Sequence, residues 1–122
     1  MQKSCALATS SLGGKPQVAT VLFTADEKLN IYFETNPEYR KATNLAKNPN
    51  AAFAITMGHL TLQVEGTVAL LEGIARKEAM ELLLKKTSSA KKWLKEGQLV
   101  FKLIPNWARL RDTEKDEFKQ II

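Results

Sequence analysis

A stretch with a two-residue period, from Leu60 to Leu71, constrains the fold more than any other part of the chain. Apolar and polar residues alternate there, and the apolar positions are Leu60, Leu62, Val64, Val68 and Leu70. This period is typical of a β-strand with one buried face. Gly66 lies in its middle, where a glycine usually marks a bulge or a close backbone approach. A long strand that bends at one point is what the closure of a small barrel requires.

Other apolar and β-branched segments predict further strands. They cover residues 5–9, 17–24, 29–35, 51–57 and 99–104. Polar turns separate the first three, which therefore predict an antiparallel meander. Pro105 and Asn106 predict a turn into a last segment over 107–111, and the mixed charges from Asp112 onward predict either a terminal helix or a frayed end.

Helices are expected between these strands. One begins at Pro37, with Asn36 as its N-cap, and stops at Asn48-Pro49-Asn50. A second covers 75–86, and a short third is capped by Thr87 or Ser88 and ends at Gly97. We interpret Lys85, Lys86, Lys91, Lys92 and Lys95 mainly as the solvated face of the last two helices.

Together these segments predict a mainly β fold. Six or seven antiparallel strands with three interrupting helices favour a small β-barrel whose openings the helices cross. The 122 residues suffice for one domain with a real core, which we place over residues 1–122.

Composition limits the compartment and the partners. The net charge of +5 favours anionic partners without choosing among them. Cys5 is the only cysteine, so the sequence offers no internal disulfide, and a reducing cytoplasm fits best. The first residues are too few and too polar for a signal peptide, and no apolar run approaches the ~20 residues that a membrane span needs. We therefore expect a cytoplasmic protein without membrane contact.

The sequence gives little indication that side chains of the protein itself catalyse a reaction. His59 is the only histidine and follows a turn glycine, and no nucleophile elbow, Walker loop or dinucleotide-binding glycine fingerprint is present in the sequence. We assign no catalytic residue and no metal ligand. Any enzyme activity is therefore expected to belong to a bound cofactor.

Two adjacent cations, Arg40 and Lys41, fall in the first turn of the predicted first helix. Positive charge is unfavourable there, because the helix dipole is positive at its N-terminus. An anion would reverse the sign, so backbone amides, the Thr35 hydroxyl and the two cations would form a phosphate site. The alternative is that both side chains extend into solvent and balance Glu38. Spacing alone does not decide between the two.

The segment 32–42, YFETNPEYRKA, resembles the "Y-T-N…S-R-K-A" segment of the pyridoxamine 5′-phosphate oxidase-like, flavin-binding split barrels. Four other segments resemble motifs of that family in the same order. They are residues 13–23, with "G-x-P"; 45–51, with "L-x-x-N/D-P-x-V"; 63–68, with "V-x-G-x-A"; and 103–112, with "P-x-x-x-x-L".

The resemblance implies a homodimeric split barrel that holds FMN between its subunits. Arg40 and Lys41 would hold the phosphate, with Thr35 and Asn36 nearby. The strand residues Ala19, Thr20, Val21 and Leu22 would lie along the isoalloxazine ring, Gln63 would contact the flavin from the bent strand, and Trp107, with Arg109 and Arg111, would stand at the partner's edge of the site. For the last three, an exposed basic face of a barrel-closing strand is an equal alternative.

Two departures from the pattern bear on activity. Tyr39 stands where the family often has a small or hydroxyl residue, which removes one possible phosphate contact. The chain also ends before the substrate-binding C-terminal segment of true pyridoxamine phosphate oxidases, so we do not expect it to make pyridoxal phosphate.

The leading hypothesis is therefore an FMN-binding oxidoreductase of unknown substrate, with deazaflavin or haem as less favoured cofactors. The alternative is a non-enzymatic small-barrel module that stores or senses flavin or binds nucleic acid. The nucleic-acid version depends on the strand aromatics Tyr32 and Phe33 and is disfavoured, because the lysines cluster elsewhere.

Overall fold

The computed structural model describes residues 3–88, 91 and 97–122. The elements follow one another along the chain as seven strands and two helices. They are β1 (Ser4–Ser10), β2 (Pro16–Ala25), β3 (Ile31–Thr35), α1 (Arg40–Lys47), β4 (Asn50–Met57), β5 (Leu60–Leu70), α2 (Gly73–Lys86), β6 (Leu99–Asp112) and β7 (Glu117–Gln120).

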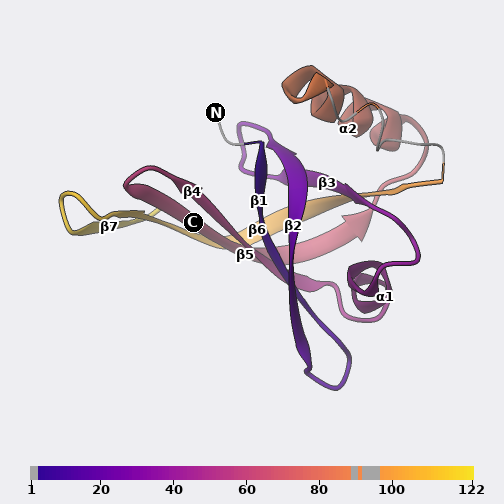
Figure 1. Ribbon diagram of the computed structural model, residues 1–122, viewed down its shortest axis with the longest axis horizontal. Coiled ribbons are helices and arrows are strands. Elements are labelled where there is room, and N and C mark those ends of the chain that lie inside the picture. Colours follow the sequence, from indigo (N-terminus) through magenta and orange to yellow (C-terminus); the bar gives the residue numbers. More distant parts are fainter. Residues whose placement is uncertain (1–2, 89–90, 92–96) are drawn as a thin grey trace.

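The sheet closes on itself. Its strand order is β3-β2-β1-β4-β5-β6-β7, every neighbouring pair is antiparallel, and an additional β3–β6 pairing joins the two sides. Strands β1 to β6 therefore form the barrel and β7 extends it as a hairpin (Figure 1). The predicted mainly β barrel is confirmed, as is the meander of the first three strands.

The bend in β5 lies where the sequence places it. The β5–β6 register shifts between Glu65 and Gly66, so that Glu65 faces Trp107 and Gly66 faces Pro105. A Cβ atom on Gly66 would lie 2.2 Å from the backbone oxygen of Ile104. Only glycine permits this approach, and the predicted bulge is confirmed.

The C-terminal part differs from the prediction. Pro105 and Asn106 do not form a turn but lie inside the continuous strand β6. The strand can contain the proline because the β5–β6 register shifts at this point, and a bulge tolerates a residue that has no amide to donate. The tail after Asp112 is neither a helix nor frayed, since β7 pairs with β6 from Arg109 to Asp112.

Helix α1 begins at Arg40 and not at Pro37. The amide of Glu38 donates to Asn36 Oδ1 at 2.9 Å and the amide of Tyr39 donates to the Asn36 carbonyl at 3.1 Å, which makes a separate turn. Tyr39 is then extended, with φ −78° and ψ 151°, so helical geometry starts one residue later. Helix α2 agrees with its prediction, and the predicted third helix lies mainly outside the described residues.

The core fills the barrel. Phe33 stacks on Phe101 and meets Phe53 edge-on, with ring centroids 5.4 Å apart in each pair. The other large side chains that are fully buried are Leu7, Ile31, Leu103, Val64 and Val100. In Figure 1, α2 lies above the strands and α1 lies at the lower right, beside the hairpin of β1 and β2. Over the part of the chain that the structure describes, neither helix has the length and apolar content to cross a lipid bilayer.

Candidate cofactor site

A pocket of about 230 Å³ lies where β3 leads into α1. Its lining residues come from β2, from the end of β3 and the turn after it, from the start of α1 and from the residue before β6. Its lining comprises Thr20, Val21, Leu22, Glu34, Thr35, Asn36, Tyr39, Lys41 and Gln98.

Lys41 is the cation of this pocket. It is the second residue of α1, only 9% of its surface is exposed, and its Nζ lies 4.5 Å from the centre of the Tyr39 ring. The first turn of α1 contains no acidic residue. The first backbone hydrogen bond of the helix runs from the Ala42 amide to the Tyr39 carbonyl, so the amides of Arg40 and Lys41 have no acceptor within the helix. The pocket thus combines a buried ammonium with a helix N-terminus, a combination suited to an anion.

Glu34 shares the pocket with Lys41. Burial raises the pKa of the Glu34 carboxyl, and the positive charge of Lys41 opposes that rise. Burial lowers the pKa of Lys41, and the charge of Glu34 opposes that fall. Each group therefore partly neutralises the other in a site that disfavours both charges.

The sequence-predicted residues divide into two groups. Thr20, Val21, Leu22, Thr35, Asn36 and Lys41 line the pocket together. Arg40 is exposed beside it and does not belong to the lining, and Ala19 is half-buried in β2 next to Thr20. Gln63 and Trp107 lie away from it on β5 and β6.

Strand register nevertheless connects the two groups across the outer surface of the barrel. Thr20 faces Ala6, Ala6 faces Ala54, Ala54 faces Gln63, and Gln63 faces Arg109. The Nη2 of Arg109 donates to Gln63 Oε1 at 3.1 Å. Three strand spacings of ~4.8 Å put Gln63 about 14 Å from Thr20. Within one chain, the pocket residues and the pair Gln63 and Trp107 therefore lie on the same face but too far apart to contact one small group together.

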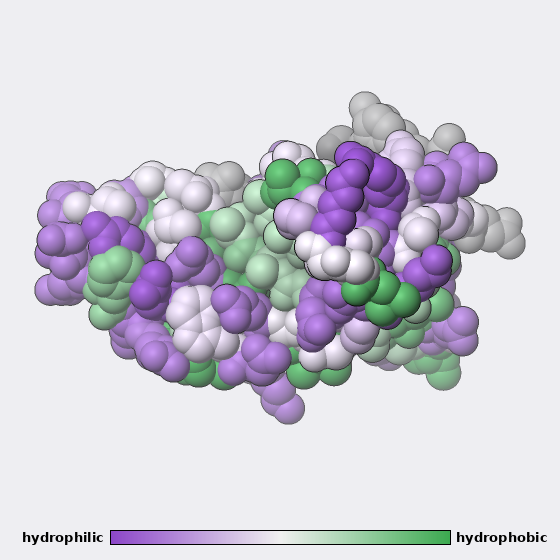
Figure 2. All heavy atoms as spheres, turned by 90° about the horizontal axis from the view of Figure 1, so that it is seen from below, coloured by the Kyte–Doolittle hydropathy of each residue, from purple (hydrophilic) through white to green (hydrophobic). Residues whose placement is uncertain are grey.

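Alanines occupy the middle of this face, on β1 and β4. A parallel row runs from Val18, 70% exposed, through Ala8 and Ala52 to Glu65 and Trp107. Between the rows lies a depression of about 190 Å³ lined by residues of β1, β2, β4 and β5. Figure 2 shows that hydrophobic residues also gather in a hollow near the centre of one side of the molecule. We call the two rows of strand residues, one from Thr20 to Arg109 and the other from Val18 to Trp107, the alanine face.

Sequence reasoning missed three members of the pocket lining, Glu34, Tyr39 and Gln98. Glu34 adjoins Thr35 on a predicted strand, and this proximity was the available signal. Gln98 enters because Thr35 pairs with Leu99, which brings the residue before β6 alongside Asn36. No local pattern indicates that pairing.

Neither of the aromatics on which the predicted nucleic-acid surface depended is exposed. Phe33 is 0% exposed in the core. The Tyr32 hydroxyl donates to Asp26 Oδ2 at 2.9 Å, and the side chain is half-buried. His59 is exposed in the β4–β5 turn, with Nδ1 3.4 Å from Glu114 Oε2.

Comparison with known proteins gives a family from the sequence and a shared fold from solved structures. The family model described as pyridoxamine 5′-phosphate oxidase matches residues 1–112. The pyridoxine/pyridoxamine 5′-phosphate oxidase of Alkalilimnicola ehrlichii is 43% identical over 67 residues, which are 53% of this chain and 34% of that protein. The chain thus spans about a third of the length of the curated relatives that it matches.

Two solved structures share the fold. A heme binding protein from Mycobacterium smegmatis superposes with a TM-score of 0.84 at 18% identity, over 98% of this chain and 52% of that one. A pyridoxamine 5′-phosphate oxidase-related, FMN binding protein from Nostoc punctiforme superposes with a TM-score of 0.70 at 13% identity, over 98% of this chain and 88% of that one.

Proposed function

Because this chain belongs to the pyridoxamine 5′-phosphate oxidase family, we propose that it binds FMN at the junction of β3 and α1 and transfers electrons through that flavin. The observation that carries the proposal is the buried Lys41 at the start of α1, inside a pocket that also holds Thr35 and Asn36. A phosphate there would receive a charge-assisted hydrogen bond and would relieve the desolvated ammonium.

The pocket accommodates only part of such a ligand. At about 230 Å³ it is smaller than the ~300–1,000 Å³ that small-molecule sites usually occupy. It suits the phosphate and the sugar-alcohol chain, while the flat ring needs additional surface. Thr20 connects the pocket to such a surface, because it lines the pocket and also faces Ala6 in the alanine face.

A second copy of the chain would supply that surface. The alanine face begins at Thr20 in the pocket and ends at Gln63, Trp107 and Arg109. Two such faces packed against each other would bring Gln63 and Trp107 of one copy toward the pocket of the other. We therefore propose a homodimer with two shared sites, in which a residue too distant within one chain contacts the ligand from its partner.

The chain's own residues would bind and orient the cofactor. When bound, FMN supplies the hydride and electron chemistry. Lys41 and the first amides of α1 hold the phosphate, and backbone groups of β2 fix the plane of the ring. The buried thiol of Cys5, whose pKa burial raises to about 12, is suited to packing and not to nucleophilic chemistry. It is also compatible with the cytoplasmic location that we propose.

Titration of the refolded, ligand-free protein with FMN, followed by flavin fluorescence, tests the binding. We expect saturable binding that Lys41→Ala weakens at least tenfold and Arg40→Ala weakens less, because Arg40 is exposed. Lys47→Ala is the matched control, since it removes a cation from the exposed last turn of the same helix. Riboflavin, which lacks the phosphate, should lose no affinity in Lys41→Ala. Equal FMN affinity in the wild type and Lys41→Ala would refute the assignment.

Two further measurements separate the alternatives. Stopped-flow reduction of the flavin-loaded protein by NADH or NADPH distinguishes an oxidoreductase from a flavin-storage or sensing module. An absorption spectrum of the purified protein, with mass spectrometry of what it releases, distinguishes FMN from deazaflavin or haem. A Soret band without flavin absorbance would overturn the proposal.

A further inference from the structure

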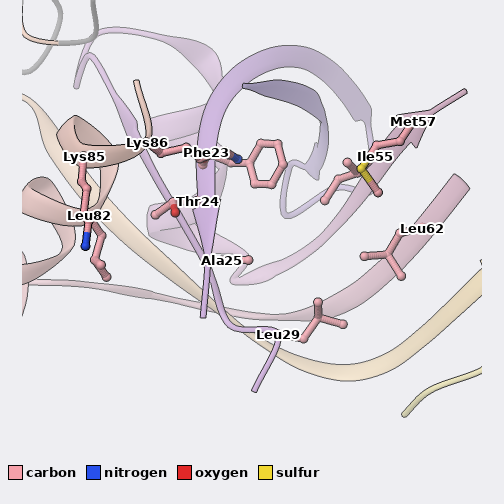
Figure 3. Close-up of a pocket in the computed structure, with 10 residues that line it drawn as sticks. All are labelled: Phe23, Thr24, Ala25, Leu29, Ile55, Met57, Leu62, Leu82, Lys85 and Lys86. Carbon is pink, nitrogen blue, oxygen red and sulfur yellow. Dashed lines mark hydrogen bonds between the residues drawn. The ribbon is translucent and has the colours of Figure 1, made fainter. Parts of the chain in front are cut away.

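A second and larger pocket, of about 490 Å³, lies between α2 and the ends of β2, β4 and β5. It shares no lining residue with the cofactor site. Its volume falls within the range of small-molecule sites. Figure 3 shows the Phe23 ring pointing toward Ile55 and Met57, while Leu82 lies beside Lys85 on α2. The large apolar side chains of its wall are Phe23, Leu29, Ile55, Met57, Leu62 and Leu82.

The charged lining residues of this pocket, Lys85 and Lys86, have the same sign, and no acidic residue belongs to the described lining. Lys86 Nζ donates to the Phe23 carbonyl at 2.8 Å and lies 3.4 Å from the centre of the Phe23 ring. An ammonium has three N–H donors, so this bond leaves capacity for an anion. Burial lowers the pKa of Lys86, as expected for a cation held against an apolar wall.

A strained residue supplies part of the wall. Leu29 has a φ of 66°, in the left-handed region that glycine and asparagine prefer. The turn around it is fixed by Asp26, whose Oδ1 accepts hydrogen bonds from the amides of Lys28 and Asn30. Leucine here is unfavourable for the backbone, but its side chain is half-buried and lines the pocket. Contacts in the pocket offset the strain.

We propose that this pocket binds an amphipathic carboxylate, whose apolar body lies against Phe23, Leu29 and Leu62 and whose carboxylate pairs with Lys86. Charge complementarity supports this class of ligand, because the described lining combines apolar side chains with two cations and no anion. The site is independent of the proposed flavin. An alkyl acid and an aryl acid present the same chemistry, and competition experiments distinguish them.

Displacement of an environment-sensitive fluorescent fatty acid tests the proposal, with decanoate and 2-naphthoate as competitors. We expect saturable one-to-one binding, and the stronger competitor assigns the alkyl or the aryl class. Lys86→Met should weaken binding of that acid at least tenfold, because methionine retains an apolar stem without the charge. Lys77→Met is the matched control, since Lys77 is exposed on the same helix and lies outside the lining.

Decanol provides the neutral comparison and should bind the wild type and Lys86→Met equally. Leu62→Trp, which fills the pocket while keeping Lys86, should abolish displacement. Circular dichroism and unchanged FMN affinity verify that each variant is folded, and they separate this test from that of the flavin site. No displacement by either acid, or equal affinities of Lys86→Met and the wild type for the stronger acid, would overturn the proposal.

Discussion

At the scale of single residues, the opposition between Glu34 and Lys41 determines what the cofactor pocket can bind. Both line the same small volume, and burial disfavours the charge of each. A phosphate that approaches Lys41 must also approach the Glu34 carboxylate. Glu34 therefore acts as an internal competitor of the ligand.

Replacing Glu34 by glutamine should tighten FMN binding about tenfold, because it removes a like charge from the ligand's surroundings and frees Lys41. Fluorescence titration at neutral pH measures the change. Glu38→Gln, an exposed acid of the preceding turn, is the control and should leave the affinity unchanged. A weaker affinity in Glu34→Gln would mean that the carboxylate accepts hydrogen bonds from the ligand.

The same substitution has a consequence for stability. Because burial raises the pKa of Glu34, the folded state holds that proton more tightly than the unfolded state does. Its contribution to stability is fully present below the unfolded pKa and is lost as pH rises through the folded pKa. Urea unfolding across that interval should show a decline in the wild type that is smaller in Glu34→Gln.

Gly66 is a residue whose role could be predicted from the sequence. An alternating strand with a central glycine predicts a bulge, and the structure contains one. Lys86 is the opposite case. It follows Lys85 in the last turn of a helix whose lysines are predicted to be solvated, and only the packing of α2 against β2 places its ammonium on Phe23.

Gly66→Ala should destabilise the fold by about 3 kcal/mol or more, because the new methyl would overlap the Ile104 carbonyl and backbone would have to move. Chemical denaturation gives the free energy of unfolding. Gly13→Ala is the control, since its nearest contact would be an ordinary 3.8 Å to Ser11 Oγ. Equal stability of the two variants would show that β6 can shift at this point without loss.

At the scale of elements, the turn between β2 and β3 depends on one carboxylate. Asp26 accepts hydrogen bonds from two amides, from Asn30 Nδ2 and from the Tyr32 hydroxyl. Burial raises the pKa of Asp26, but the bonds from Asn30, Tyr32 and Lys28 together outweigh it and lower the pKa. The turn is therefore strongest when this group is ionised.

Asp26→Ala should destabilise the protein by about 2–3 kcal/mol at neutral pH, since it leaves several donors of the turn without their acceptor. The folded pKa lies below the ordinary value, so this stabilisation is present above the unfolded pKa and disappears as pH falls through the folded one. Urea unfolding at pH 7 and in acid should show the gap between wild type and variant narrowing in acid. Glu27→Ala, from the same turn, should show no comparable gap.

Element boundaries show where prediction from the sequence fails. Pro37 suggests a helix start, but the hydrogen bonds of Asn36 form a turn first and the helix begins at Arg40. Pro105 suggests the end of a strand, but the bulge opposite Gly66 accommodates it. At Pro37 local hydrogen bonds outweigh the tendency of proline to begin a helix, and at Pro105 the pairing of β6 with β5 outweighs its tendency to end a strand.

At the scale of the whole molecule, the alanine face is the surface on which the proposed dimer depends. Its middle consists of alanines on β1 and β4, so two sheets could approach closely there. The sequence predicts the strands that form it but not their order, because the β1–β4 pairing joins segments from opposite sides of α1.

Ala54→Arg should convert a dimer into a monomer and weaken FMN binding, because a long cation would enter the middle of the alanine face. Sedimentation velocity measures the mass, and fluorescence titration measures the affinity. Ile74→Arg is the control, since Ile74 is 76% exposed on α2. A wild-type monomer that binds FMN fully would contradict the dimer and leave the phosphate site to be tested by itself.

The pairing of β3 with β6 has a consequence during synthesis. Ile31 to Thr35 meet their partners only at Leu99 to Leu103, about 70 residues later in the chain. A ribosome adding ~5–20 residues per second would leave one side of β3 as an exposed edge for several seconds. An unpaired strand edge can pair with strands of other chains, so we expect the nascent protein to aggregate through β3 unless this edge is covered. Pulsed hydrogen exchange during refolding would show it: the amides of β3 that bond to β6 should become protected last.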